Sequence, residues 1–172
     1  MRTHHSIIAG LMLAGALALT GCSKDPVTKD LELYAAVVKH VVNPAELDPL
    51  EQKLQTARTP DDQVALMNAY AEVVERQVSV LQSYQPKTPE VAKLSDDLHA
   101  GMSQMAQTAR EFQSVASLLK QAQASQSQPD AVRAMGRVTI LMEKMDEGKR
   151  KAMTAASALD ALAASKGVKR PK

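Results

Sequence analysis

The sequence predicts an all-α protein, an elongated up-down bundle of four main helices in which the first helix is broken and the last two form a long antiparallel hairpin. Three observations predict this fold. Apolar residues recur at steps of three and four through long stretches of the chain, which is the period of one helix face. Proline-containing start signals divide these stretches into segments. No stretch of useful length shows the strict alternation that is typical of a strand.

The first helix is expected to start at about Asp30. Its inward face consists of residues at helical spacing: Leu31, Tyr34, Val38, Val41 and Val42. Asn43-Pro44 interrupts the pattern, because proline lacks the backbone N–H that a helix interior needs. A shorter amphipathic piece follows over about 45–57, and its apolar residues are Leu47, Leu50 and Leu54. We therefore expect the first helix to be broken.

The second helix has a clear start signal in Thr59-Pro60-Asp61-Asp62. Threonine is a good N-cap, proline fits the first turn, and acidic side chains are favourable near the positive end of the helix dipole. The helix should run to about Ser83. Its inward residues are Val64, Met67, Tyr70 or Ala71, Val74, Val78 and Leu81. Thr88-Pro89-Glu90 repeats the same signal and starts the third helix.

The third helix contains five apolar residues spaced by seven without exception: Val91, Leu98, Met105, Phe112 and Leu119. The alternate positions are filled by Leu94, Met102, Ala109, Ala116 and Ala122. Such a repeat predicts a coiled-coil-like seam. Because Phe112 falls on this seam, we expect Phe112→Ala to lower the stability by about 3 kcal/mol or more, as the loss of a core aromatic does.

The fourth helix is expected to start at Gln128-Pro129-Asp130. Its predicted inward stripe is Val132, Met135, Val138, Met142, Met145, Ala152, Ala156, Leu159 and Ala163. The last two helices are each about 50 Å long at 1.5 Å per residue. A short connection should fold them back on each other. This pairing brings Phe112 near Met142, Leu119 near Met135, and Leu98 near Ala156 or Leu159. Two glycines within these helices, Gly101 and Gly136, could allow close helix approach or a bend.

A targeting segment precedes the predicted bundle. Arg2 and the amino terminus give it a positive start, and an apolar run follows over residues 7–19. That run is too short for a permanent membrane span, which needs about 20 apolar residues, but it fits a cleavable export signal. It closes on Leu19-Thr20-Gly21-Cys22, and Cys22 is the only cysteine in the chain. These four residues resemble the lipobox of bacterial lipoproteins.

The resemblance, confined to residues 1–22, implies a lipid anchor. A diacylglycerol is attached to the Cys22 sulfur, the signal peptidase recognises Leu19, Thr20 and Gly21 and cuts before Cys22, and the new amine usually receives an acyl chain. The mature protein then stays on the membrane without a spanning helix. Ser23 stands where aspartate favours inner-membrane retention in enterobacterial lipoproteins. The expected location is therefore the periplasmic face of the outer membrane, in preference to the inner membrane.

The chain is accordingly divided into residues 1–21 as signal peptide, 22–29 as lipidated cysteine and short tether, 30–165 as the helical bundle domain, and 166–172 as a basic flexible tail. After lipidation no cysteine remains for a disulfide, so packing alone must stabilise the bundle. Aromatic residues make up 2% of the chain and the formal net charge is +2. Both values argue against glycan stacking and nucleic-acid binding.

Candidate reactive residues are few. Asp96 and His99 have the spacing of metal ligands on a helix, but no matching pairs occur elsewhere. The favoured interpretation is therefore that the two side chains are solvated and bind no metal. Two M-x-x-M pairs, Met102/Met105 and Met142/Met145, could bind Cu(I), yet both fall on inward stripes where methionine fills gaps.

No nucleophile motif or phosphate-binding glycine loop occurs. Paired acids, among them Glu72/Glu75, are expected on polar faces. Lys149 continues the seven-residue series of the fourth helix. It either fixes the helix register or extends out at the stripe's edge, and the second is preferred. The sequence predicts no enzyme, no resident cofactor and no metal site.

Three classes of function remain. The first is a non-enzymatic module that binds another envelope protein, such as a pilotin, an assembly accessory or an immunity-like protein. The second is a structural spacer that self-associates through the seam of the third helix. The third is copper handling by the methionines. An exposed apolar groove would favour the first class, and an uncovered seam would favour the second. No small-molecule substrate is inferred.

Overall fold

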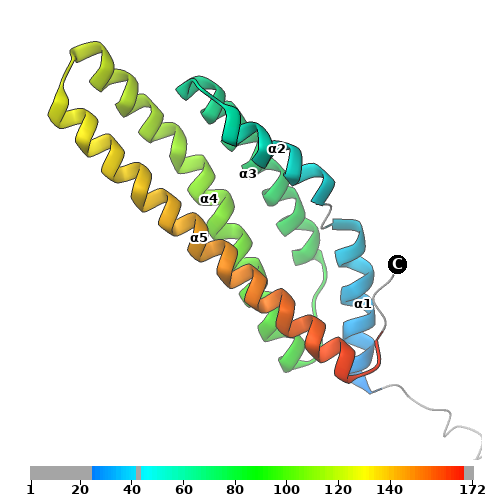
Figure 1. Cartoon of the computed structure of the whole chain (residues 1–172). Helices are drawn as coiled ribbons and strands as arrows, with labels where there is room; N and C mark the ends of the chain where they lie inside the picture. The colour runs from blue at the N-terminus through cyan, green and yellow to red at the C-terminus, as the bar shows by residue number, and fades with distance from the viewer. Residues whose placement is uncertain (1–24, 42–43, 169–172) are drawn as a thin grey trace, which may run out of the picture.

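The computed structural model describes residues 25–41 and 44–168, and within these ranges it contains helices and no strand. The elements are α1 (Pro26–Val41), α2 (Pro44–Thr56), α3 (Pro60–Ser83), α4 (Pro89–Ser125) and α5 (Gln128–Ser165) (Figure 1). The all-α prediction is confirmed. The predictions for Leu19, Thr20, Gly21, Cys22 and Ser23, and for the last four residues of the tail, lie outside the described residues.

Proline marks the start of all five helices. It occupies the first or second helical position in each: Pro26, Pro44, Pro60, Pro89 and Pro129. These positions need no intrahelical N–H partner, so proline is tolerated there and its fixed φ suits the first turn. The predicted cap on α3 is present, since Thr59 Oγ1 accepts a hydrogen bond of 3.1 Å from the Asp62 N–H.

The helices do not form a closed four-helix bundle. α4 packs between α3 and α5, and no contact joins α3 to α5 within the described ranges. The backbone of α1 packs close to α3, α4 and α5, whereas that of α2 packs close to α3 alone. The finer prediction of four main helices is therefore not confirmed, because the two parts of the first segment are separate helices with different neighbours.

The α4/α5 hairpin is held together by an unusually close backbone approach. A Cβ atom on Gly101 would lie 2.5 Å from the Ala152 nitrogen and 2.8 Å from the Gly148 carbonyl oxygen. A Cβ on Gly148 would lie 2.9 Å from the Gly101 carbonyl oxygen. Real Cβ contacts are longer than this, so only glycine fits at either position. Of the two glycines noted in the sequence, Gly101 thus allows close approach, while Gly136 has nothing within 4 Å.

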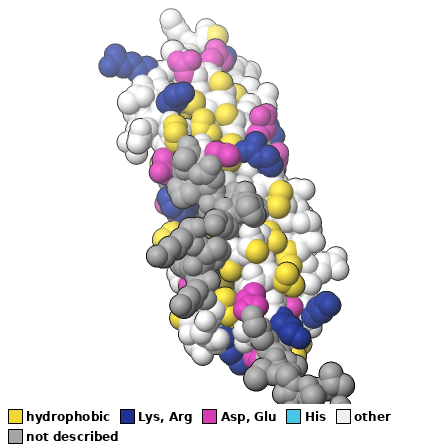
Figure 2. All heavy atoms as spheres, turned by 90° about the vertical axis from the view of Figure 1, so that its right-hand side faces the viewer, with side chains coloured by type: hydrophobic (Ala, Val, Ile, Leu, Met, Phe, Trp, Pro, Cys, Tyr) yellow, Lys and Arg dark blue, Asp and Glu magenta, His cyan; other side chains and the backbone are white. Residues whose placement is uncertain are grey.

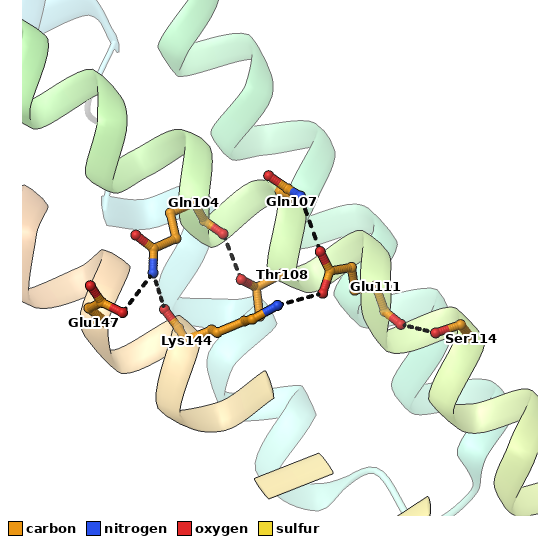
Figure 3. A network of polar contacts seen from close by, with 7 residues as sticks. All are labelled: Gln104, Gln107, Thr108, Glu111, Ser114, Lys144 and Glu147. Carbon is orange, nitrogen blue, oxygen red and sulfur yellow. Dashed lines mark hydrogen bonds and ion pairs between the residues drawn. The ribbon is translucent and has the colours of Figure 1, made fainter. Parts of the chain in front are cut away.

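Polar contacts along one edge of the hairpin fix its register (Figure 3). Gln104 Nε2 donates to the Lys144 carbonyl oxygen at 3.1 Å and to Glu147 at 3.3 Å. About two turns further along α4, Glu111 Oε2 pairs with Lys144 Nζ at 3.2 Å. Exposed ion pairs of this kind each contribute little free energy, but a shift of one residue would break them together.

The start of α4 is capped by a side chain from α1. Asp30 is 4% exposed, and its Oδ2 accepts hydrogen bonds from the Lys87 N–H (2.8 Å), the Thr88 N–H (2.6 Å) and the Thr88 hydroxyl (2.7 Å). The Asp30 carbonyl oxygen also accepts a bond of 2.6 Å from the Tyr84 hydroxyl. Thr88 is the N-cap of α4 as predicted, but its side chain does not cap its own helix, because its hydroxyl donates to Asp30.

The predicted inward stripe of the last helix is only partly correct over its first half, where Val138 and Met145 are half-buried. The residues of α5 that pack against α4 there are Ala134, Leu141 and Gly148. Val132, Met135 and Met142 are instead 67%, 60% and 62% exposed. The stripe has the expected period, but no helix covers it at this end. The contact expected between Met142 and Phe112 is therefore not a core contact.

The predicted seam of the third helix is correct over its first three members. Val91, Leu98 and Met105 are buried on α4. Phe112 and Leu119 are only half-buried, because they lie on the part of the bundle that lacks a fourth helix. None of the helices in the described ranges is long and apolar enough to span a membrane.

Candidate binding site along helix α5

One face of α5 carries two apolar features, a cavity and an exposed stripe. Met135, Met142, Lys149, Ala156 and Ala163 are spaced by seven, so they follow one face of the helix. The last three line a cavity, and the first two are exposed. We call Val132, Met135 and Met142 the uncovered stripe, and the space beside residues 149–163 the α5 cavity.

The α5 cavity has a volume of about 510 Å³ and lies between α1, α2 and α5, with α4 at its base. Its walls are mostly aliphatic and aromatic side chains, among them Leu31, Tyr34, Leu98, Met102, Ala156 and Leu159. Figure 2, which views the molecule from the side of α1 and α2, shows hydrophobic side chains gathered in two groups, with acidic and basic side chains beside them. This volume is within the usual range of ligand sites.

The cavity follows from the small residues of α5. Ala152, Ala156 and Ala163 stand on its wall where leucine would fill the space. α1 packs across this end of the bundle, but α2 leans on α3, where an Arg76–Glu46 ion pair joins the two helices. Thin side chains on one wall and a diverging helix on the other leave a gap between the helices.

The polar groups at the cavity include Glu51, Gln77, Lys149 and Asp160. Lys149 Nζ lies 3.9 Å from Glu51 Oε1, across the space between α5 and α2. Gln77 also lines the cavity, is 3% exposed, and its Nε2 has no hydrogen-bond partner within the described part of the chain. Buried polar atoms almost always have a partner, so this amide is the exceptional group of the site.

The tyrosines of the wall are neutral at physiological pH. Burial raises the pKa of Tyr34 well above its ordinary value, with a smaller effect from Tyr84. Burial and the nearby Glu51 carboxylate raise the pKa of Tyr70 to about 12. Neither hydroxyl therefore ionises below strongly alkaline pH, and the aromatic part of the wall remains uncharged.

The four methionines proposed as copper ligands do not share one environment. Met102 and Met105 are buried, Met145 is half-buried and Met142 is 62% exposed. Core packing, the favoured interpretation, is confirmed for Met102 and Met105 and is wrong for Met142. Met142 instead belongs to the uncovered stripe.

The other candidate residues lie on separate surfaces. Asp96 is exposed, while His99 is half-buried and its imidazole lies 3.5 Å from the Ser95 hydroxyl. Burial lowers the pKa of His99, and the Asp96 carboxylate opposes that shift. In the described ranges, no group of three or more His, Cys, Asp or Glu side chains could hold a metal ion.

The acidic pair Glu72/Glu75 lies on an exposed face, where Arg110 reaches both residues. The Arg110 guanidinium bonds to Glu75 and holds the pKa of that carboxyl below its usual value. Lys149 is about half-exposed at the cavity edge, which agrees with a side chain that extends outward from the stripe.

Two important residues were missed in the sequence although a signal exists. Gly148 belongs to a second series spaced by seven, and this series, which contacts α4, comprises Ala134, Leu141, Gly148, Ala155 and Leu162. Gln77 lies between Val74 and Val78 on the predicted inward face of α3, so its burial could have been inferred. Asp30 gave no such signal, because its partners Lys87 and Thr88 are far along the chain.

Comparison with known proteins found no match for this chain among family models, curated proteins or solved structures.

Proposed function

We propose that this protein is a lipid-anchored, non-enzymatic module on the periplasmic face of the outer membrane, and that it binds a partner envelope protein through the uncovered stripe of α5. The supporting observation is the exposure of Val132, Met135 and Met142, each more than half accessible on one helix face. The anchor is attached to Cys22 as the lipobox resemblance implies.

The stripe has the chemistry of a helix-docking surface. Its side chains follow one another at steps of three and seven, and half-buried Phe112 and Leu119 lie on the adjoining helix α4. Contiguous exposed apolar residues on a soluble surface mark interaction sites more often than single ones do. An amphipathic helix that lays its apolar face against α4 and α5 would take the place that the fourth helix of a closed bundle has.

The location of the stripe favours a partner outside the bilayer. The chain enters the bundle at α1, beside the end of α5, and the α4/α5 turn lies at the opposite end of the molecule (Figure 1). α5 has 38 residues, so its two ends are about 57 Å apart. The stripe begins four residues after the first residue of α5, at the end remote from the anchor.

The alternative function, a self-associating structural spacer, would use a different surface from the one first expected. The first three members of the third-helix seam, Val91, Leu98 and Met105, are buried. Self-association would therefore also have to use the uncovered stripe, with a second copy as the partner. Copper handling remains a minor alternative, with Met142 as its exposed sulfur.

The proposal is tested with Met142→Lys in the tagged, lipidated full-length protein, after cross-linking in cells. Lysine places a charge in the centre of the stripe, and we expect partner proteins that co-purify with the wild type to fall at least tenfold in yield. The matched control is Ile140→Lys, because Ile140 is 53% exposed on α5 but lies off the stripe.

The outcome separates the two functions. A loss of a distinct partner with Met142→Lys alone supports the binding module. A cross-linked homodimer that disappears in the same variant supports the spacer. Equal yields from wild type, Met142→Lys and Ile140→Lys would contradict both.

A further inference from the structure

We propose that three methionines of α5 form an oxidation site, in which a hypohalous acid converts Met135, Met142 and Met153 to sulfoxides before the other described methionines. The same reaction switches off docking at the uncovered stripe, and this second step rests on the proposed function. The inference depends on the exposure of the three side chains, on the face that they share and on the burial of the other methionines.

The three methionines follow one face of α5. Met135 and Met142 are seven residues apart, and Met153 follows after eleven more. At 3.6 residues per turn both steps are close to whole numbers of turns, so the side chains form one row about 27 Å long. Their exposed fractions are 60%, 62% and 60%. An oxidant in solution therefore reaches all three from the same side of the molecule.

The other methionines of the described ranges are less accessible. Met102 and Met105 on α4 are 8% and 9% exposed. Met67 and Met145 are half-buried. Away from the methionine row, the exposed large hydrophobic side chains contain no sulfur: Leu33, Val80 and Ile140. In this part of the chain, well exposed thioethers are thus concentrated on one face of α5.

No thiol competes with these thioethers in the described helices. The only cysteine is Cys22, which lies outside the described residues, and the proposed anchor turns its sulfur into a thioether as well. Cysteine thiolates are otherwise the side chains that oxidants attack first. Without them, the exposed methionines are the most reactive groups that the folded bundle presents to a hypohalous acid.

The reaction is a two-electron oxidation of each sulfur. Hypochlorous acid transfers a chlorine cation to the thioether and releases hydroxide. Water then attacks the sulfur, chloride leaves, and two protons are lost, one of which neutralises the hydroxide. The products are the sulfoxide, chloride and one proton, so the sulfur is oxidised and the chlorine is reduced.

Sulfoxides change the chemistry of the uncovered stripe. Oxidation makes an apolar side chain polar, and Met135 and Met142 are two of the three residues of the stripe. A sulfoxide oxygen buried against the apolar face of a partner costs free energy unless it accepts a hydrogen bond there. Methionine sulfoxide reductases restore the thioether, so the loss of docking is reversible.

The first test measures the order of oxidation. The lipidated full-length protein is treated with rising amounts of hypochlorous acid, the reaction is stopped with free methionine, and peptide mass spectrometry gives the sulfoxide fraction at each methionine. We expect the three methionines of the row to react at least tenfold faster than Met102 and Met105. The control is the same treatment of peptides from a digested sample, in which all methionines should react at similar rates.

The second test measures docking. Cells that produce the tagged protein are exposed to sublethal hypochlorous acid before cross-linking, and the yield of the co-purified partner should fall at least fivefold. A variant that combines Met135→Leu, Met142→Leu and Met153→Leu keeps the apolar volume and removes the sulfur, so it should retain its partner after the same treatment. Met67→Leu removes a half-buried sulfur from α3. It is the matched control and should respond like the wild type.

Thermal unfolding separates the switch from damage to the fold. Because the three side chains are exposed, their oxidation should leave the melting temperature unchanged. Treatment of the oxidised protein with methionine sulfoxide reductases should restore the partner yield. A lower melting temperature that accompanies the loss of the partner would mean that oxidation unfolds the bundle, and would overturn the switch.

The two tests fail separately. Similar oxidation rates at exposed and buried methionines of the folded protein, or chlorination of lysines in place of sulfoxide formation, overturn the oxidation site. Selective oxidation without a change in partner yield, or an equal loss in the wild type and the leucine variant, overturns the switch. If the untreated wild type captures no partner, the proposed function fails and the switch fails with it, while the oxidation rates still decide the site.

Discussion

At the residue scale, Asp30 joins three parts of the chain. Its carboxylate accepts three hydrogen bonds at the start of α4, and its carbonyl oxygen accepts one from Tyr84 at the end of α3. Burial alone would raise the pKa of Asp30, but the bonds from Thr88 and Lys87 outweigh it, and the pKa lies below its ordinary value. One buried side chain therefore fixes α1 against the α3–α4 connection.

Replacement of Asp30 should be among the most destabilising single changes in the chain. Asp30→Ala leaves the Lys87 and Thr88 N–H groups without their acceptor, and we expect the free energy of unfolding to fall by about 2–3 kcal/mol. Urea unfolding followed by circular dichroism measures it. Asp62→Ala, at the exposed start of α3, is the control and should cost less than 1 kcal/mol. Equal losses would mean that the Asp30 bonds contribute no more than a surface cap.

The same group predicts an acid-sensitive fold. Because the pKa of Asp30 is lower in the folded state, its contribution is complete above the unfolded value of about 3.9 and is lost as the pH falls through the folded value. The melting temperature of the wild type should therefore drop more steeply below pH 4 than that of Asp30→Asn. Parallel melting curves against pH for the two proteins would contradict this assignment.

The sequence predicted Thr88 as an N-cap but not its partner. Thr88 was recognisable because a cap precedes a proline and an acid at a fixed spacing. Asp30 was not, because a bond between residues 58 positions apart leaves no local pattern. Gln77 falls between these cases, since its spacing on α3 predicts burial but cannot show that its amide lacks a partner.

At the element scale, two glycines control the α4/α5 hairpin. Gly101 and Gly148 bring the two backbones into contact, whereas a Cβ atom on Gly136 of α5 would meet nothing within 4 Å beyond its own helix backbone. Close packing of the two helices thus requires glycine at two of these helical positions but not at the third.

Alanine substitutions should therefore have opposite effects. Gly101→Ala forces a Cβ atom against the Ala152 backbone, and we expect a loss of about 1–3 kcal/mol or more, as overpacking causes. Gly136→Ala should raise the stability by up to about 1 kcal/mol, since alanine is the better helix former. Chemical unfolding of both variants measures the difference. Stabilisation by both changes would show that the helices can separate without cost.

Because Phe112 is only half-buried, its replacement by alanine should lower the stability less than the sequence alone predicts. Phe112→Ala should cost about 1–2 kcal/mol, roughly half of the loss at a fully buried aromatic. Leu98→Ala, at a position 5% exposed, should cost about 2–5 kcal/mol. Thermal melting of the two variants gives the order. A larger loss for Phe112→Ala would mean that the uncovered end of the hairpin is shielded in solution.

Periodicity predicted the faces of the helices better than it predicted what covers them. The seven-residue series of α4 is buried over Val91, Leu98 and Met105, as expected. On α5 two seven-residue series could form the buried face, one through Met142 and one through Leu141. The helical period alone does not show which of them is buried. The choice depends on where α1 and α2 pack, which is a tertiary property.

At the scale of the whole molecule, the bundle is asymmetric. The three long helices α3, α4 and α5 pack side by side in chain order. α1 covers one end of α5, and the other end is uncovered. The fold class and the helix starts could be predicted, because proline and cap residues act locally. The open side could not, because it results from the divergence of α2 toward α3.

The proposed lipid anchor predicts that mutation changes the location of the protein. Cys22→Ala removes the only thiol, so the protein should lose its lipid label and leave the outer-membrane fraction, either released or unprocessed in the inner membrane. Ser23→Asp should keep the lipid and, in an enterobacterial host, accumulate in the inner membrane. Membrane fractionation with mass spectrometry of the amino-terminal peptide checks both variants. A labelled Cys22→Ala protein in the outer membrane would contradict the anchor.

The ion pair between Asp25 and Lys166, 2.8 Å long, has a practical consequence. It brings the entry of the first helix beside the exit of the last, and chains with adjacent ends tolerate circular permutation. With residues 1–24 moved to the new amino terminus, a short linker across this pair and new termini at the exposed Gln126 of the hairpin turn would invert the molecule on the proposed anchor. If the proposed anchor is correct, the end of α5 that is remote from Asp25 would then lie next to the membrane surface.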